Sequence, residues 1–355
     1  MKKRKSRSSW PFGMLCILVG SYLWLWVKLS SSAPPSSNDP TTSTVAPYII
    51  PESKRGSTLI VAFCNFHFRS VGITWYQRMS KLGYDNHLLV ATDEAMQHFL
   101  ETQQQSLPTQ IRYQVWIHEP LPKNILSKPK SKQEHPYLET LMAVRWKYLL
   151  RQLEDYGMHV VLTDVDNIFT RYLDVDEEFT NKNKDVDVWH AYATKFPLNA
   201  FAKQGFCVCS GMSWWRASPG GIRFARLMRD SCGDMCDDQR VLNNLLSTSP
   251  KLNMTWIWTT EAQKSRLTNS STNDPRFLGL PTLGISGHSE VTGHTARIWD
   301  RDFAFRGPLF PDTCPPNNWV SMPILDAKSR QTAWLTKLES FQEWDTHCGE
   351  QTQSR

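Results

Sequence analysis

The chain has 355 residues, of which 40% are hydrophobic, and its formal net charge at pH 7 is +6. That excess lies entirely in residues 1–30, which hold six Lys or Arg and no acidic residue. The rest of the chain is balanced, so its charge gives no reason to expect a nucleic-acid-binding protein.

The N-terminal segment predicts a membrane anchor. Basic residues 1–9 precede an uncharged apolar run over residues 10–27, which Lys28 closes. This length spans a bilayer core, and the basic residues favour a cytosolic N-terminus. A cleaved signal peptide is the alternative, but Pro34 disfavours cleavage at the weak site before it. We therefore expect a cytosolic tail over 1–9 and a transmembrane signal anchor over 10–28.

Residues 29–56 are rich in Ser, Thr and Pro and predict an extended stem. Residues 57–349 have a globular composition and form the expected lumenal domain. This order of segments is typical of a single-pass type II protein, and we expect it in the Golgi membrane.

The cysteines fit an oxidising compartment. Seven lie beyond the anchor: Cys64, Cys207, Cys209, Cys232, Cys236, Cys314 and Cys348. Their spacings match no familiar zinc site, so we favour disulfides, with the pairing left open. Asn253 and Asn269 begin glycosylation sequons, which indicates a glycoprotein.

The globular part alternates strands with helices. Strands are predicted over residues 58–63, 87–91, 111–116, 159–162 and 186–189, and helices over residues 71–82, 93–102 and 138–153. Gly83 and Gly157 follow two of the helices and are typical helix stops. Alternation of this kind predicts an α/β fold with a mostly parallel sheet.

Two carboxylates follow the apolar run of residues 159–162. Side chains at i and i+2 of a strand point to the same side, so Asp164 and Asp166 can converge on one cation. Oxygen ligands suit a divalent ion that also binds phosphates, and ligands bind at the carboxyl ends of strands in such sheets. The motif therefore predicts a metal–diphosphate site. Two further Asp-Val-Asp triplets, at 174–176 and 185–187, are assigned to capping and surface roles.

Several short motifs recur in an order that resembles one family. They are a strand followed by Asn65, Leu82-Gly83, Val90 to Asp93, Lys147 and Leu150, Gly157, Asp164 to Asp166, Ser210 to Arg216, and Asp238-Gln239 ahead of Val241 to Asn243. This order resembles the nucleotide-diphospho-sugar transferases that include plant rhamnogalacturonan xylosyltransferases and extensin arabinosyltransferases. Cys209 departs from the family, which usually has Asn there, and so does the run Phe66 to Arg69, where the family favours small residues.

The resemblance implies a GT-A type glycosyltransferase with a Rossmann-like nucleotide half joined to an acceptor half. It implies that Asp164 and Asp166 hold Mn²⁺ or Mg²⁺, with His288 or His294 as a possible third ligand. Candidate donor-binding residues are Asn65, Asp93, Lys147, Ser210 and Gly211. Asn65 and Asp93 have the alternative roles of a turn residue and a helix start.

The same resemblance implies transfer with retention of configuration, in which Asp238 and Gln239 orient the sugar or the acceptor. If the reaction inverts, Asp237 or Asp238 becomes the general-base candidate. The expected partners are a UDP-sugar donor, a glycan or glycoprotein acceptor and the membrane. A metal-dependent phosphoester hydrolase and an inactive lectin-like ectodomain are the alternatives from other classes.

Overall fold

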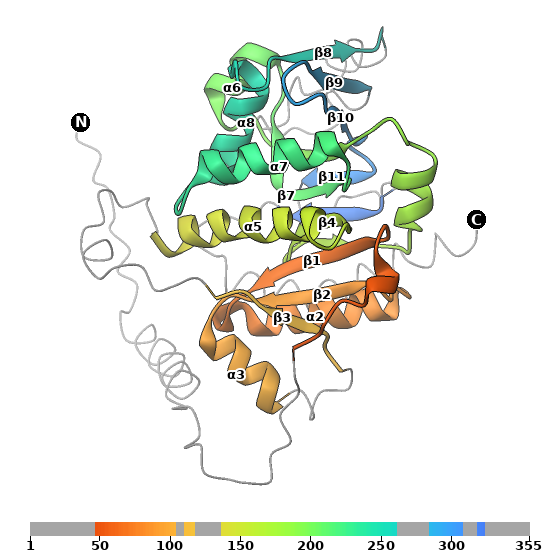
Figure 1. The fold of residues 1–355 in the computed structure, drawn as a ribbon, viewed down its shortest axis with the longest axis vertical. Coiled ribbons are helices and arrows are strands. Elements are labelled where there is room, and N and C mark those ends of the chain that lie inside the picture. The colour runs from red at the N-terminus through yellow and green to blue at the C-terminus, as the bar shows by residue number, and fades with distance from the viewer. Residues whose placement is uncertain (1–46, 104–109, 118–135, 261–283, 308–317, 324–355) are drawn as a thin grey trace, which may run out of the picture. The chain divides into compact units, whose positions relative to one another are not determined.

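A nine-stranded mixed sheet forms the centre of the structure, a computed structural model that describes residues 47–103, 110–117, 136–260, 284–307 and 318–323. Its strand order is β3-β2-β1-β4-β7-β6-β10-β9-β8 (Figure 1). The strands are β1 (Thr58–Cys64), β2 (His87–Ala91), β3 (Tyr113–Val115), β4 (His159–Asp164), β6 (Val188–Tyr192), β7 (Val208–Trp215), β8 (Met254–Trp258), β9 (Ile285–Ser289) and β10 (Thr295–Ile298). The predicted α/β fold is confirmed.

The first half of the sheet is parallel, as predicted. Strands β3, β2, β1 and β4 run in the same direction, and every residue of β1 and β2 is buried. When helices cover both faces of a parallel sheet, the side chains on both sides of a strand are buried, and this explains the unbroken apolar sequence. The intervening helices are α2 (Arg69–Lys81), α3 (Glu94–Gln103) and α5 (Pro136–Glu154). Gly83 and Gly157 have φ of +92° and +61°, the left-handed conformation that ends a helix.

The second half corrects the prediction of a mostly parallel sheet. Strand β7 runs antiparallel to both of its neighbours, β4 and β6, and β9 is antiparallel to β10 and β8. Of the eight neighbouring strand pairs described in this nine-stranded sheet, four are parallel and four are antiparallel. Because β7 is reversed, its first residues lie beside the last residues of β4.

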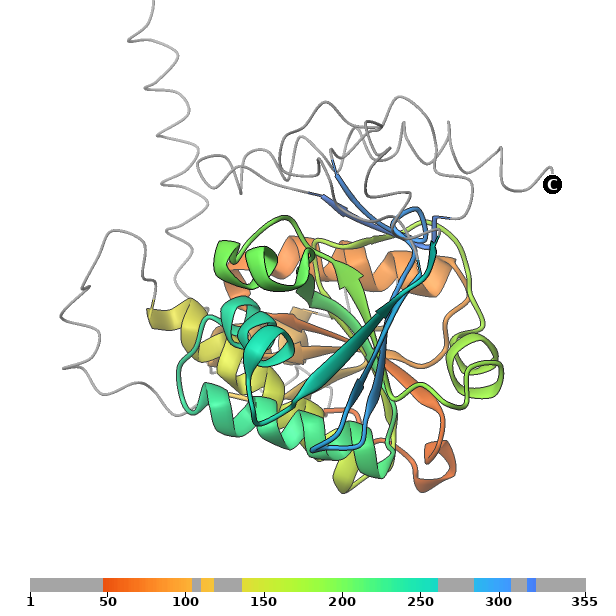
Figure 2. The ribbon, with the colours of Figure 1, turned by 90° about the horizontal axis from the view of Figure 1, so that it is seen from above.

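Helices cover the sheet on both faces (Figure 2). Helices α5, α7 (Pro219–Cys232) and α8 (Asp238–Thr248) share one hydrophobic cluster with Val160 and Leu162 of β4. Helices α2 and α3 share the other cluster with Val161. Successive residues of β4 therefore face opposite layers. By this alternation the side chain of Asp164 faces the α5 layer.

A small second sheet lies on the α2 side. Its order is β11 (Ala304–Gly307), β12 (Val320–Pro323) and β5 (Ile168–Phe169). The ring of Phe169 packs edge-on against Trp319, at 5.3 Å between centroids. This contact fixes the segment that follows the Asp164 motif.

The folded domain begins before the predicted boundary at residue 57. Ile50 is buried in the core, and the backbone N–H of Tyr48 donates to the carbonyl of Tyr113 at 2.7 Å. The last residues of the predicted stem thus pack against the edge of the sheet. The predicted anchor, residues 10–28, lies outside the described residues, and no described helix is long and apolar enough to cross a membrane.

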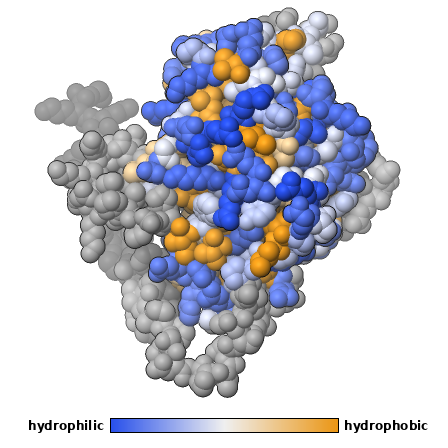
Figure 3. Space-filling model, viewed as in Figure 1, coloured by the Kyte–Doolittle hydropathy of each residue, from blue (hydrophilic) through white to orange (hydrophobic). Residues whose placement is uncertain are grey.

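The face over α5 and α7 is mostly hydrophilic, with separate hydrophobic patches (Figure 3). One disulfide, Cys232–Cys236, joins the end of α7 to the residue before Asp237. This bond agrees with the preference for disulfides over zinc. Cys64, Cys207 and Cys209 are buried free thiols, and Cys314 and Cys348 lie outside the described residues.

Candidate active site

Asp164 is the last residue of β4, and its side chain is 41% exposed at the carboxyl end of the strand. The strand ends there rather than continuing through Asp166. The amide of Asn167 donates to the carbonyl of Asp164 at 3.2 Å, which closes a turn. Asp166 lies in this turn and is half-buried, and Val165 between the two carboxylates is buried. Both carboxylates are therefore accessible, although only Asp164 is held in the sheet.

Gly211 of β7 approaches Asp164 at the point where the antiparallel strands meet. A Cβ atom at Gly211 would lie 1.9 Å from Asp164 Oδ2, so no other residue fits without displacing the carboxylate. Asn167 Nδ2 fixes this approach, because it donates to the carbonyl of Gly211 at 2.8 Å and to Thr163 Oγ1 at 3.0 Å. The glycine provides space for the carboxylate.

We expect Gly211→Ala to displace the Asp164 carboxylate and to reduce both stability and activity. Overpacking of this kind costs about 1–3 kcal/mol. Thermal unfolding and a transfer assay check it together. Gly287→Ala in β9 is the matched control, because its Cβ would lie 2.5 Å from the Trp256 ring and should lower stability without displacing Asp164. Wild-type activity in Gly211→Ala would contradict the close approach.

Arg145 of α5 lies behind Asp164 and is almost completely buried. Its Nη1 is 2.9 Å from Asp164 Oδ1 and 3.9 Å from Asp238 Oδ2, and its Nη2 donates to the carbonyl of Ser210 at 3.2 Å. One buried cation thus joins the end of β4, the start of β7 and the start of α8. A buried charge requires partners of this kind.

Asp238 and Gln239 begin α8 and hold Ser210 from the other side. Asp238 Oδ1 accepts a hydrogen bond from Ser210 Oγ at 3.0 Å, and Gln239 Oε1 accepts from Ser210 N at 3.0 Å. Gln239 Nε2 also donates to the carbonyl of Val208. Asp238 Oδ2 is buried and has no hydrogen-bond partner among the described residues. Four of the predicted residues therefore form one site, namely Asp164, Ser210, Gly211 and Asp238, with Gln239 beside them.

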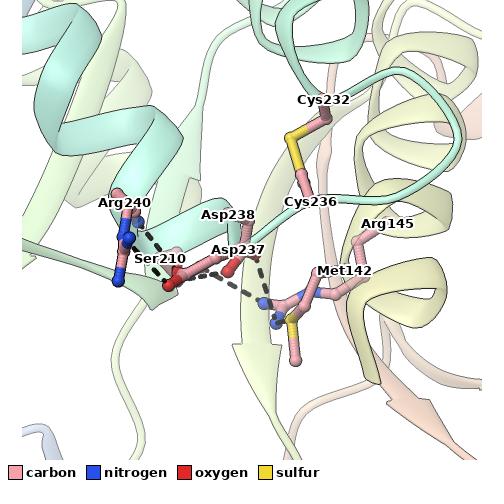
Figure 4. Close-up of a disulfide and its surroundings, with 8 residues drawn as sticks. All are labelled: Met142, Arg145, Ser210, Cys232, Cys236, Asp237, Asp238 and Arg240. Carbon is pink, nitrogen blue, oxygen red and sulfur yellow. Dashed lines mark hydrogen bonds and ion pairs between the residues drawn. A yellow bond between two sulfur atoms is a disulfide. The ribbon is translucent and has the colours of Figure 1, made fainter. Parts of the chain in front are cut away.

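Figure 4 shows how the disulfide leads into this site. From Cys236 the chain passes through Asp237, which caps α8 by accepting from Arg240 N at 3.0 Å. Asp238 follows and turns toward Arg145. This hydrogen bond gives Asp237 the role of a helix cap, and its role as a general base stays a prediction.

In the buried part of the site, neighbouring charged groups affect the pKa values of Arg145 and Asp238. Burial raises the pKa of the Asp238 carboxyl, while Arg145 acts in the opposite direction. For Arg145, burial disfavours the charged form, but the carboxylates of Asp164 and Asp238 outweigh it and raise the pKa of the guanidinium. Arg145 therefore stays charged and supplies the counter-charge for both carboxylates.

Asn65 and Asp93 lie at the carboxyl ends of β1 and β2, as predicted. Asn65 Oδ1 accepts from Phe68 N at 3.0 Å, and Asp93 Oδ1 accepts from Met96 N at 2.7 Å at the start of α3. Asp93 also accepts from Phe66 N, so the two strand ends are tied together. These bonds describe turn and cap roles, and donor binding by the two residues stays a prediction.

Lys147 does not reach this group. Its Nζ pairs with Asp234 Oδ1 at 2.7 Å on the exposed side of α5. Arg145, two residues earlier on the same helix, is the basic residue that reaches the site. The sequence indicates that Arg145 faces the core, because it falls three residues after Met142 and four before Leu149, on the otherwise apolar side of the helix.

The two histidines do not join the carboxylates, which corrects the prediction of a third metal ligand. His288 pairs with Thr295, at the first residue of β10, and His294 immediately precedes that strand. Ala296 of β10 pairs with Val188 of β6, Val188 pairs with Trp215 of β7, and Trp215 pairs with Val160 near the start of β4. The two histidines therefore lie level with the start of β4. Asp164 lies four residues further along β4, about 13 Å away along the strand and three strands across the sheet.

His294 is instead a core residue. It is fully buried, its ring stacks on Phe224 at 4.2 Å between centroids, and its Nδ1 is 2.6 Å from Thr292 Oγ1. Burial lowers the pKa of His294 to about 3. Burial likewise lowers the pKa of His190 to about 3, and those of His87 and His159 to about 4.

We expect these four neutral histidines to make the fold sensitive to acid. Their folded-state pKa values lie below the ordinary value of about 6.5, so the unfolded chain binds more protons below that pH and stability falls. Each contributes a slope approaching about 1.4 kcal/mol per pH unit between about pH 6.5 and pH 4. Burial raises the pKa values of Asp238 and Asp300, which act in the opposite direction, but these two groups oppose four histidines. Urea unfolding at pH 7, 6 and 5 checks this, and constant or rising stability on acidification would contradict it.

The carboxylates partly fit a divalent metal. Asp164 and Asp166 are accessible oxygen donors at one edge of the sheet, the donor type that Mn²⁺ and Mg²⁺ take. Within the described ranges, no group of three or more His, Cys, Asp or Glu side chains surrounds them. The set suits an ion held by one or two carboxylates plus substrate phosphates, rather than a closed protein cage.

Comparison with known proteins gives a family match and a likeness to solved structures. Residues 82–272, which include both the Asp164 and the Asp238 motifs, match the family described as nucleotide-diphospho-sugar transferase. The solved structure of the galactosyltransferase LgtC with donor and acceptor sugar analogues is 11% identical with a TM-score of 0.37, and covers 72% of this chain and 90% of LgtC. An LgtC active-site mutant is 12% identical with a TM-score of 0.37, and covers 78% and 95%. No curated protein matches in sequence.

Proposed function

Because the chain belongs to the nucleotide-diphospho-sugar transferase family and is therefore a glycosyltransferase, we propose that it transfers a sugar from a UDP-sugar to a glycan or glycoprotein. The observation that carries the proposal is the convergence of Asp164, Arg145 and Asp238 at the carboxyl end of β4. This is the edge of an α/β sheet at which ligands bind. The kinship to plant xylosyl- and arabinosyltransferases stays a prediction.

The accessible carboxylates are suited to the diphosphate end of the donor. Asp164 and Asp166 would hold Mn²⁺ or Mg²⁺, which when bound neutralises the charge that builds up on the departing UDP. Asp164 is prepared for this role because Gly211 and Arg145 fix its carboxylate from two sides. A carboxylate held in place needs little reorganisation when the ligand arrives.

The buried polar group behind Asp164 is suited to the transferred sugar. Asp238 Oδ2 lacks a hydrogen-bond partner among the described residues, and a sugar hydroxyl is a donor that would satisfy it. Ser210 and Gln239 hold Asp238 and the start of β7 in position through their mutual hydrogen bonds. In this role Asp238 recognises the donor sugar.

We propose transfer with retention of configuration. The burial of Asp238 and its contacts with Arg145 and Ser210 make it a poor general base for a solvent-borne acceptor. In a front-face reaction the acceptor oxygen bonds to the anomeric carbon as the bond to the phosphate oxygen breaks. The acceptor proton passes to that phosphate oxygen, so no enzymic base is required.

A donor assay tests the proposal. The full chain is incubated with UDP-sugars and Mn²⁺, with and without glycan acceptors, and the nucleotide and sugar products are identified by mass and NMR spectra. We expect intact UDP and a glycoside whose anomeric configuration equals that of the donor. UMP with a sugar phosphate would identify a phosphoester hydrolase instead, and the absence of turnover with every donor would favour the inactive ectodomain.

We also propose that residues 10–28 hold the protein in the Golgi membrane with the catalytic domain in the lumen. The basic residues before this apolar run support the proposal. We expect the native full chain to sediment with membranes and to resist alkaline carbonate extraction. Soluble native protein with a new N-terminus near Pro34 would contradict an uncleaved anchor.

A further inference from the structure

A cleft of about 740 Å³ lies away from the Asp164 site. It is bounded by β6, by the segment after β10 and by the short π-helix η4 (Asp176–Asn181), the yellow-green coil at the right of Figure 1. Its aromatic residues belong to, or pack against, the hydrophobic cluster on the α2 side of the sheet. Asp164 faces the α5 side, so the cleft and the candidate active site lie on opposite faces.

Four aromatic rings line this cleft: Phe179, Trp189, Trp299 and Phe303. The rings of Trp189 and Trp299 are stacked at 6.4 Å with an interplanar angle of 15°, and Phe179 lies 5.6 Å from Trp299. Trp189 and Phe303 are only half-buried, so part of each ring is available to a ligand. Flat aromatic faces of this kind match the apolar C–H faces of sugar rings.

Donors and acceptors are both left over in the lining. The Nε1 atoms of Trp189 and Trp299 are buried and have no hydrogen-bond partner in the described part of the chain. The residue Trp299 as a whole is only 2% exposed. Asp300 and Asp302 are exposed carboxylates that form no ion pair with another described residue. Indole N–H groups require acceptors and carboxylates require donors, and a hydroxyl serves both.

The charges of the cleft disfavour an anionic ligand. Lys182 is matched by Glu178 at 3.3 Å, and Arg171 donates to the carbonyl of Asn318 at 3.2 Å. The lining holds three acidic residues, Glu178, Asp300 and Asp302, against the two basic residues Arg171 and Lys182, so its formal charge is −1. A phosphate-bearing or acidic ligand would be repelled there, whereas a neutral hydroxyl-bearing ligand would not.

We propose that this cleft binds a neutral oligosaccharide segment, separately from the site of sugar transfer. Its volume lies in the usual range of about 300–1,000 Å³ for ligand sites. Its link to catalysis, as a second contact for a polymeric glycan acceptor, rests on the proposed function. Binding itself does not, because it requires neither donor nor turnover.

Saturation-transfer NMR and titration of the full chain with neutral gluco-, galacto-, manno-, xylo- and arabino-oligosaccharides test the proposal. We expect at least one series to bind, and Asp302→Ala and Trp189→Leu each to weaken it by about tenfold or more. Asp155→Ala, an exposed carboxylate on the α5 side, is the matched control and should bind normally. Asp302 is exposed, so its replacement tests the cleft even if Trp189→Leu fails to fold.

Binding must also be independent of the transfer site. We expect Asp164→Asn, and wild-type protein saturated with UDP, to bind the oligosaccharide with unchanged affinity. Loss of binding in either case, equal binding by the cleft variants, tighter binding of oligogalacturonides, or the failure of every neutral series would overturn the proposal. Transfer without binding would refute the cleft alone, and binding without transfer would refute the proposed function alone.

Discussion

Asp164→Asn should lower kcat/KM for sugar transfer by at least about a hundredfold, the usual loss when one preorganised electrostatic contact to the reacting group is removed. Asn preserves the size of the side chain and a carbonyl oxygen beside Gly211, but it removes the charge that attracts the cation and pairs with Arg145. Arg145 keeps Asp238 as a counter-charge, so the fold should survive. Steady-state kinetics with UDP-sugar and Mn²⁺, together with thermal unfolding, separate the two effects.

Asp174→Asn is the matched control for this change. Asp174 begins another Asp-Val-Asp triplet, but it is exposed and its Oδ1 accepts a hydrogen bond from Glu177 N at 3.0 Å. An exposed cap lies outside the site, so we expect activity within about twofold of wild type, because surface changes usually stay within 0.5 kcal/mol. Equal losses in both variants would indicate general destabilisation, and an unchanged Asp164→Asn would remove this carboxylate from the mechanism.

The sequence predicted best those elements whose pattern depends on burial alone. Strands β1, β2 and β4 were predicted within a residue or two, because central parallel strands are apolar on both faces. The reversal of β7 was not predictable in this way, since burial patterns do not encode strand direction. Yet that reversal places Gly211 against Asp164. Each motif could be recognised in the sequence, but the contact between the two could not be predicted from it.

The errors at the site have the same origin. His294 has the residue type of a metal ligand, but only the strand register shows that it lies at the wrong end of the sheet. Arg145 belongs to none of the family motifs, and it reaches the site because α5 packs behind β4. Lys147 was selected from a family pattern, although the helix turns it toward solvent and Asp234. Residue type identifies candidate site residues, but only the three-dimensional packing determines which of them lie at the site.

Arg145→Met should be the most destabilising single change in the site. Met matches much of the aliphatic length of Arg, so the packing loss is small, but Asp238 is left buried with no counter-charge. Removing one partner of a buried ion pair costs about 3–5 kcal/mol. Lys147→Met is the matched control, since it breaks an exposed Lys–Asp pair on the same helix, and such pairs contribute about 0–1 kcal/mol. Urea unfolding of the two variants at pH 7 measures the difference.

The double variant Arg145→Met, Asp238→Asn identifies the cause. If an uncompensated carboxylate is responsible, neutralising it should restore much of the lost free energy of unfolding, and the two single changes should be strongly non-additive. Transfer should stay low in the double variant, because the residue proposed to recognise the donor sugar has lost its charge. Additive losses would mean that Arg145 stabilises the fold through packing and its hydrogen bond to Ser210 rather than through Asp238. The charge network proposed for this site would then have no energetic basis.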